Sequence, residues 1–330
     1  YLFVVEERDA FMLIAKRKSG IAGDKTSYAR MLLKDFKRYK YLYFMILPAI
    51  VYLAVFSYVP MYGILMGFEN FSVTKGVFGS EWVWFEHFIK FFTGPYFGRT
   101  LRNTLMLNFY GLFIVFPMPI IFALLLNEIR SRSFKRIVQT VSYLPYFVSI
   151  VVITGIIKDF TSQTGLLSYL VQQITGSPDI TNLLTRPEFF RPIYIASDIW
   201  QYTGFGSIIY INALSGINPE LYEAATIDGA GRWKQMLHVT LAGLAPTIII
   251  LFILQLGSIM NVAFDKAFLL QNASIYETAD VIATYVYRQG LQFGQFSYAT
   301  AVGLFNTVVN FAILVLANNI SRKVSETSLF

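Results

Sequence analysis

Residues 221–246 read LYEAATIDGAGRWKQMLHVTLAGLAP, a polar, helix-forming passage that lies between two long apolar runs. Glu223 falls in the first turn of the helix-forming part, where the helix dipole favours negative charge. Asp228 and Gly229 end that helix, because Gly adopts a left-handed backbone at little cost and Asp favours turns. The passage therefore predicts a short helix followed by a tight turn.

A second helix is predicted directly after the turn. Trp233, Met236 and Leu237 are spaced i, i+3 and i+4, so a helix that begins near Arg232 has one apolar face. The result is a helix, a turn and a helix at a membrane boundary. From these features alone, the passage is either an ordinary amphipathic connector between two spans or a surface on which another protein docks.

The composition of the whole chain indicates an integral membrane protein. Of its 330 residues, 55% are hydrophobic and only 14% are charged, whereas about 25% charged is typical of soluble domains. The mean hydropathy is +0.52. There is no Cys, which excludes disulfides and thiolate chemistry, and the two histidines, His87 and His238, make an imidazole metal cluster improbable. We therefore expect no metal site.

Gaps between charged residues predict six transmembrane helices, because a bilayer core requires about 20 apolar residues per helix. The predicted spans are residues 41–68, 103–127, 136–158, 197–219, 235–264 and 289–321. These runs are long and continuously apolar, so helices are favoured over a β-barrel, whose strands alternate over about ten residues. The fold class expected is an all-α polytopic membrane protein.

The distribution of Lys and Arg predicts the orientation. With the N-terminus inside, the inner segments hold 18 of the 27 Lys and Arg residues, as expected when cations stay on the cytoplasmic side. Both termini and the passage around Glu223 are then cytoplasmic. The net charge of +7 is accordingly explained by an anionic inner membrane surface and not by nucleic acid.

Three parts follow from this topology. Residues 1–40 form a cytoplasmic segment with a basic amphipathic helix over 28–41, residues 41–320 form the transmembrane domain, and residues 321–330 form a cytoplasmic tail. Three outer loops are long, at about 69–102, 159–196 and 265–288. The first is rich in aromatic residues, which suits an interfacial belt or a docking surface for an external partner. The second contains an amphipathic helix over 165–174.

Polar residues within two predicted spans mark a candidate pathway. They are Trp200, Gln201, Tyr202 and Thr203 in the fourth span and Gln255, Ser258 and Asn261 in the fifth. Polar groups at membrane depth normally face a bundle interior or a wet cavity, so they either bond neighbouring helices or line a solute path. Aromatic rings beside amides suit a sugar, because pyranose faces stack on rings and hydroxyls need donors and acceptors.

The chain shows no energy source of its own. Residues 20–26 lack the spacing of a phosphate-binding loop, so we expect no ATP binding by this chain. A proton- or ion-coupled carrier would show carboxylates or histidines near mid-bilayer, but Asp198 and His238 lie near span ends. No nucleophile or metal constellation is legible, so the chain is not expected to be an enzyme. Energy must therefore come through a partner.

The passage around Glu223 resembles a known motif. Glu223, Ala224 and Ala225, three further residues, Gly229, nine residues and then Val239-x-Leu241 resemble the EAA motif of inner-membrane permease subunits of binding-protein-dependent ABC importers. Residues 217–222 (INPELY) resemble the usual lead-in of the sugar permeases, as do Asp228, Gly229 and Ala230. One departure is Ala242, which stands where the family has Pro. The likeness extends over about residues 40–320 and is strongest to the Bacillus-type complex-oligosaccharide group, on account of residues 285–291 and 296–303.

The resemblance implies a fold and a set of partners. The fold would be that of a type I ABC importer permease with six spans, in a bacterial cell membrane. The partners would be a second permease subunit in a heterodimer, two ATPase subunits that hold the ATP and Mg²⁺, and an extracellular lipoprotein that binds a carbohydrate. Residues of about 220–236 would form the coupling helix, with contacts to the ATPase made by Glu223, Ala224, Ala225, Asp228, Gly229 and Ala230.

Two other classes remain open at this point. An importer permease of the same family could carry a non-sugar solute, because amino-acid, phosphate and peptide permeases share the motif more loosely. A secondary carrier would work without ATP. Identifying the solute that the lipoprotein partner binds would distinguish a sugar permease from a non-sugar permease. Uptake that is insensitive to vanadate would favour a secondary carrier.

Overall fold

A computed structural model describes residues 36, 38–176 and 182–324, and these are mostly helical. The chain divides into two compact units, one up to Tyr62 and the other from Gly63 onward. Most of the amphipathic helix predicted over 28–41, together with residues 1–35 and most of the predicted tail, lies outside the described residues.

The first apolar segment is continuous over Lys40–Phe68. It consists of α3 (Lys40–Leu53), a π-helical turn (Ala54–Tyr58) and a 3₁₀ segment (Val59–Phe68). Pro48 lies inside α3 and removes one backbone donor. The segment agrees with the predicted span 41–68.

Short elements follow in the region of the first predicted outer loop. Strands β1 (Glu69–Asn70) and β2 (Glu81–Trp82) pair antiparallel, with a 3₁₀ turn (Val77–Gly79) between them. Helix α4 (Glu86–Thr93) comes next. A ring nitrogen of His87 lies 3.0 Å from the carbonyl of Glu69, which ties α4 to β1.

Five helical segments of the described chain are long and apolar enough to cross a membrane: Lys40–Phe68, Phe97–Glu128, Ile150–Thr175, Arg232–Leu256 and Phe296–Ile320. The second joins α5 (Phe97–Tyr110), a π-helical turn (Gly111–Val115) and α6 (Pro117–Glu128). The fourth joins α12 (Arg232–Gln235), a π-helical turn (Met236–Thr240) and α13 (Leu241–Leu256). The fifth lies in α17 (Phe296–Val324).

The prediction of one span over 136–158 was wrong. This region forms α7 (Arg132–Tyr143), a 3₁₀ turn (Leu144–Phe147) and α8 (Ile150–Thr161). Pro145 has no N–H, so it cannot continue the α-helical ladder. Val148 is extended, and the Ser149 hydroxyl accepts the N–H of Val152 at 3.4 Å, which starts a new helix. The amphipathic helix predicted over 165–174 is present as α9 (Leu166–Thr175).

Helix α10 (Pro187–Ser215) contains most of the predicted fourth span, yet it is not one of the five apolar segments. Its polar residues at the predicted path lower its hydropathy. It contacts α5, α6, α7 and α13, as well as α15 (Tyr276–Ala279). At its crossing with α7 it carries Gly204, where a Cβ would lie 2.0 Å from the carbonyl oxygen of Ser142.

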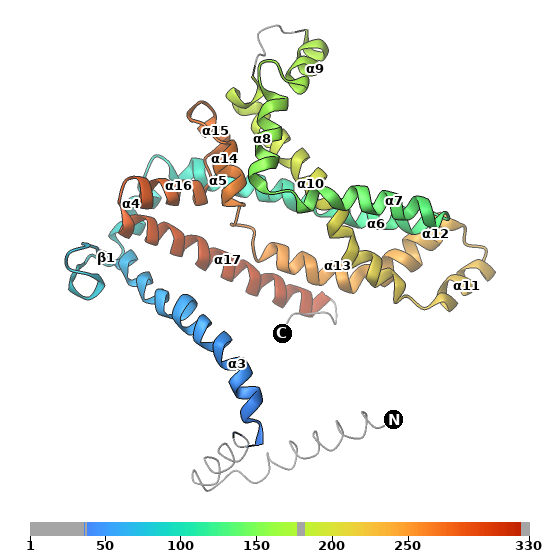
Figure 1. Ribbon diagram of the computed structural model, residues 1–330, viewed down its shortest axis with the longest axis horizontal. Coiled ribbons are helices and arrows are strands. Elements are labelled where there is room, and N and C mark those ends of the chain that lie inside the picture. The colour runs from blue at the N-terminus through green and yellow to red at the C-terminus, as the bar shows by residue number, and fades with distance from the viewer. Residues whose placement is uncertain (1–35, 37, 177–181, 325–330) are drawn as a thin grey trace. The chain divides into compact units, whose positions relative to one another are not determined.

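The segments between α13 and α17 complete the second unit. Helices α14 (Phe264–Leu270) and α16 (Ile282–Tyr287), a 3₁₀ turn (Ala273–Ile275) and a π-helical turn (Arg288–Gln292) lie there. Another 3₁₀ turn (Leu183–Thr185) precedes α10. Within this unit, α13 and α17 pack together, and α11 (Pro219–Ile227) and α12 lie at the end opposite to β1 and α4 (Figure 1).

A buried carboxylate holds several of these elements together. Asp280 is fully buried and accepts hydrogen bonds from Arg99 of α5 at 2.7 Å and from Arg288 at 2.7 and 2.8 Å. Asn103 of α5 donates to the carbonyl of Asp280 at 3.1 Å, and Arg191 of α10 donates to Asn103 at 2.8 Å. The cluster therefore joins α5 and α10 to the segment around Asp280 through paired charges.

Candidate functional site

The predicted helix–turn–helix around Glu223 is confirmed in the structure. Pro219 occupies the first position of α11, and the side chain of Asn218 accepts the N–H of Glu220 at 3.0 Å, which starts the helix. The turn follows at Asp228, and Gly229 has a φ of 74°. L-residues rarely adopt this left-handed conformation, which explains why Gly is required at that position.

Side-chain hydrogen bonds fix the shape of this hairpin, which consists of α11, the turn and α12. The Gln235 amide donates to the Thr226 hydroxyl and to the Ala230 carbonyl, each at 3.0 Å. The hydroxyls of Tyr222 and Thr240 lie 3.0 Å apart. The two bonds of Gln235 join α12 to the end of α11 and to the turn. The contact between Tyr222 and Thr240 joins α11 to the π-helical turn before α13.

The hairpin exposes large apolar side chains beside polar and small residues. Ile227 is 86% exposed and Trp233 is 75% exposed. Of the predicted coupling residues, Glu223, Ala224, Asp228 and Gly229 are exposed, and Ala225 and Ala230 are half-buried. Exposed apolar groups beside small residues and a carboxylate are typical of a surface that another protein covers.

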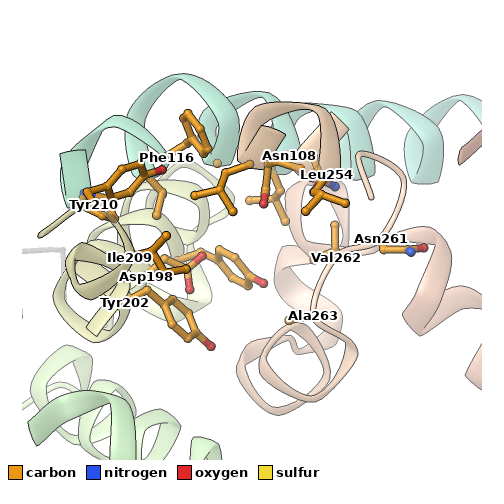
Figure 2. Close-up of a pocket in the computed structure, with 18 residues that line it drawn as sticks. Asn108, Phe116, Asp198, Tyr202, Ile209, Tyr210, Leu254, Asn261, Val262 and Ala263 are labelled. Carbon is orange, nitrogen blue, oxygen red and sulfur yellow. The ribbon is translucent and has the colours of Figure 1, made fainter. Parts of the chain in front are cut away.

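A cavity of about 560 Å³ lies inside the second unit. Its walls come from α5 and the turn after it, from α6, α10 and α13, and from the linker that joins α13 to α14. Figure 2 shows Asp198 and Tyr202 of α10 on one side of the cavity and Val262 and Ala263 of the linker on the other. Mostly apolar walls with a few polar groups are usual for small-molecule sites.

The polar groups of the cavity are hydroxyls, amides and one carboxylate. Tyr202 lines it and lies edge-to-face with Tyr146 at a centroid distance of 6.1 Å. Tyr146 in turn stacks on Phe205 at 3.9 Å. Asn108 and Gln255 also line the cavity. These groups can stack on sugar rings and exchange hydrogen bonds with hydroxyls.

Three of the seven predicted path residues line the cavity: Tyr202, Gln255 and Asn261. The side-chain oxygen of Asn261 accepts hydrogen bonds from Asn306 at 2.9 Å and Asn310 at 3.0 Å, and in Figure 2 it points away from the other labelled side chains. Asn261 thus serves helix packing as well as the wall.

The other four lie elsewhere. Trp200 is 52% exposed, and Gln201 is buried at 4% exposure. The Thr203 hydroxyl is also buried, and the Ser258 hydroxyl donates to the carbonyl of Gln255 at 3.0 Å. The spacing of these residues could not separate the cavity face of a helix from its packing faces, because every face of α10 carries polar residues.

Sequence reasoning missed the ion pair between Asp198 and Lys266. Lys266 donates to Asp198 at 2.5 Å and to the carbonyl of Tyr194 at 2.9 Å, and its ammonium lies 4.2 Å from the centroid of the Tyr194 ring. Burial lowers the pKa of the Lys266 ammonium, and the charge of Asp198 opposes that shift. The two residues are 68 positions apart, so only the fold brings them together.

Within the described residues, no group of three or more His, Cys, Asp or Glu side chains is placed to hold a metal ion.

Solved structures resemble this chain closely. The chain superposes on a chain in a crystal structure of a bacterial alginate ABC transporter in complex with an alginate pentasaccharide-bound periplasmic protein. The TM-score is 0.82 and the identity 43%, over 90% of this chain and 99% of that one.

Curated relatives include other transport permeases. The polygalacturonan/rhamnogalacturonan transport system permease protein YteP of Bacillus subtilis is 43% identical over 93% of this chain and 95% of its own length. The arabinooligosaccharides transport system permease protein AraP of the same organism is 30% identical over 70% of this chain and 72% of its own. The model of one family, described as the binding-protein-dependent transport system inner membrane component, matches residues 115–326. This chain therefore belongs to the family of inner membrane components of binding-protein-dependent transport systems.

Proposed function

We propose that this chain forms half of the pathway through which an ATP-driven importer moves an oligosaccharide across the cell membrane. The chain is a multi-pass membrane component of an ABC importer and a transport subunit. The observation that carries the proposal is the cavity of about 560 Å³, in which Tyr202, Asn108 and Gln255 offer a ring, a hydroxyl and amides to a solute.

The relatives support a saccharide as the solute. The names of YteP and AraP specify polygalacturonan, rhamnogalacturonan and arabinooligosaccharides, and the solved complex contains an alginate pentasaccharide on its periplasmic protein. All of these are polymers of sugar units, some acidic and some neutral. The cavity, with a few polar groups on largely apolar walls, suits a saccharide of this kind.

The hairpin supports a coupling role. Its exposed face, with Glu223, Ala224 and Gly229, would dock on an ATPase subunit that holds the ATP and Mg²⁺. Ala224 and Ala225 allow close approach, Glu223 supplies a polar contact, and Gly229 shapes the turn. Two ATPases, a second permease subunit in a heterodimer and an extracellular lipoprotein complete the working unit.

The proposed topology has six spans, with α10 as the span that joins the five apolar segments. It places the N-terminus, the C-terminus and the hairpin in the cytoplasm. The support comes from the distribution of Lys and Arg and from the position of α11 and α12 at the end of the unit away from β1 and α4 (Figure 1).

The test is uptake of an oligosaccharide by proteoliposomes that contain the assembled importer, its lipoprotein and ATP. Gly229→Asp and Glu223→Lys are expected to abolish uptake while the protein stays in the membrane at wild-type abundance. Glu86→Lys, at the other end of the unit, is the control and should leave uptake unchanged. Wild-type uptake in both hairpin variants would contradict the coupling role, and uptake that resists vanadate would favour an ATP-independent carrier.

A further inference from the structure

Asp198 is the one charged side chain among the described residues that line the cavity. The remaining walls carry apolar groups, tyrosine hydroxyls and amides. A single charge in such a place sets the local potential, because the apolar walls screen it less than water would.

The cation that compensates Asp198 lies behind the wall. The Lys266 side chain is 1% exposed, whereas that of Asp198 is 17% exposed. The Lys266 ammonium uses its contacts on Asp198, on the Tyr194 carbonyl and on the Tyr194 ring. The pair therefore presents its negative end to the cavity, and the positive end faces the protein.

We propose that the Asp198–Lys266 pair sets the charge selectivity of the pathway. One oxygen of the carboxylate is held by Lys266, which leaves the other as an acceptor for hydroxyl groups of a sugar unit. Lys266 is a positioning residue, since it fixes the carboxylate and cancels most of its charge. With this compensation, an oligosaccharide is recognised by its hydroxyls and an acidic one is not repelled.

The ion pair connects α10 to the segment that forms the opposite wall of the cavity. Lys266 lies on α14, directly after the linker whose Val262 and Ala263 face Asp198 across the cavity (Figure 2). On its other side, the linker is held by Asn310 of α17, whose side chain bonds the N–H of Met260 at 2.8 Å and the side chain of Asn261. The pair thus joins α10 to a wall segment that is anchored at both ends.

The inference rests on the proposed function, and its test compares two solutes that differ only in charge. The probes are trigalacturonic acid and its fully methyl-esterified form, supplied with the same lipoprotein to proteoliposomes of each variant. The quantity measured is the ratio of acidic to neutral uptake at saturating solute. Any preference of the lipoprotein cancels when the ratios of variants are compared.

The two single variants are expected to shift the ratio of acidic to neutral uptake in opposite directions. Asp198→Asn leaves the ammonium uncompensated and should raise the acidic-to-neutral ratio about tenfold, and Lys266→Gln should lower it by a similar factor, since one unpaired charge is left in a poorly screened site. A purely structural role would lower uptake of both probes together and leave the ratio unchanged. Unchanged ratios in assembled variants would overturn the proposal.

Removing one partner of a buried pair can prevent folding, so two double variants keep the pair matched. Exchanging the charges, Asp198→Lys with Lys266→Asp, turns the positive end toward the cavity and should raise the ratio. Asp198→Asn with Lys266→Gln removes both charges and should give a ratio between that of wild type and that of the charge exchange. A charge exchange that assembles but leaves the ratio unaltered would also overturn the proposal.

Asp265→Asn is the matched control, because Asp265 is an exposed carboxylate next to Lys266 that does not line the cavity. It changes the net charge of the chain as Asp198→Asn does, and its ratio should equal that of wild type. If the wild-type importer takes up neither probe although the lipoprotein binds them, the proposed function fails. If wild-type uptake is normal and the ratios do not move, only the charge inference fails.

Discussion

At Gly204, the backbone of α10 comes close to the backbone of α7. A Cβ at this position would lie 2.0 Å from the carbonyl oxygen of Ser142 and 2.5 Å from its carbonyl carbon. Backbone atoms cannot move away as a flexible side chain can, so the contact requires a residue without a side chain. The crossing also positions Tyr202, two residues earlier, at the cavity.

Gly204→Ala is therefore expected to separate the two helices and to lower stability by about 1–3 kcal/mol, the usual cost of overpacking. Thermal unfolding of the purified chain in detergent measures the effect as a lower Tm. The matched control is Gly155→Ala in α8, where a Cβ would have no neighbour within 4 Å. An unchanged Tm for Gly204→Ala would contradict the close approach.

For single residues, the sequence predicted local backbone conformation better than it predicted contacts between residues far apart in the chain. The left-handed turn at Gly229 follows from the preceding Asp and the end of a helical pattern, and the structure confirms it. The pairing of Asp198 with Lys266 could not be predicted, because nothing in the local pattern of either residue points to the other. The prediction that Asp198 lies near the end of a span concealed its place on the cavity wall.

The hairpin of α11 and α12 acts as one element because Gln235 closes it. Besides the two bonds of the Gln235 amide, the N–H of Ala230 donates to the carbonyl of Ala225 at 2.8 Å. Movement of a partner against α11 would therefore carry α12 with it. The helix then continues through the π-helical turn into α13 without a break.

Replacement of this glutamine tests the mechanical role of the hairpin. Gln235→Ala removes both bonds, and we expect it to lower the amount of solute moved per ATP hydrolysed about threefold, since each hydrogen bond contributes about 1 kcal/mol. Uptake and phosphate release are measured on the same proteoliposomes. Gln295→Ala, an exposed glutamine at the other end of the unit, serves as the control. An unaltered ratio of solute to ATP would show that the hairpin stays rigid without Gln235.

The helix is weakened near Ala242, the position at which the passage departs from the motif that it resembles. Pro246 lies inside α13 and has no N–H, so the carbonyl of Ala242, four residues earlier, receives no helical hydrogen bond from it. The π-helical turn Met236–Thr240 lies directly before. The ladder is thus weakened near residue 242 by a proline one turn further along the chain.

Element boundaries were predicted well where a run was uniformly apolar and poorly where it was interrupted. The first, second, fifth and sixth predicted spans overlap Lys40–Phe68, Phe97–Glu128, Arg232–Leu256 and Phe296–Ile320. The third failed because the absence of charge over 136–158 says nothing about backbone geometry at Pro145 and Ser149. The position of Pro145 determines where the helix breaks.

For the whole molecule, the topology can be tested by labelling, because the natural chain has no cysteine. Val73→Cys and Ile227→Cys introduce single thiols at positions that are 76% and 86% exposed. On intact cells, a membrane-impermeant maleimide is expected to label the first and not the second. Both should react after permeabilisation, which is the control. Labelling of Ile227→Cys from outside would contradict a cytoplasmic hairpin.

The polar character of α10 has a consequence for how this protein is made. Hydrophobic segments enter the bilayer from the translocon according to their own apolarity, and five segments within residues 38–176 and 182–324 meet that condition. Helix α10 does not, yet it contacts α5, α6 and α7, all of which leave the ribosome before it. In the proposed six-span topology, its insertion would draw on neighbours that are already in place, so mutations that weaken α6 or α7 should appear first as faulty biogenesis of α10.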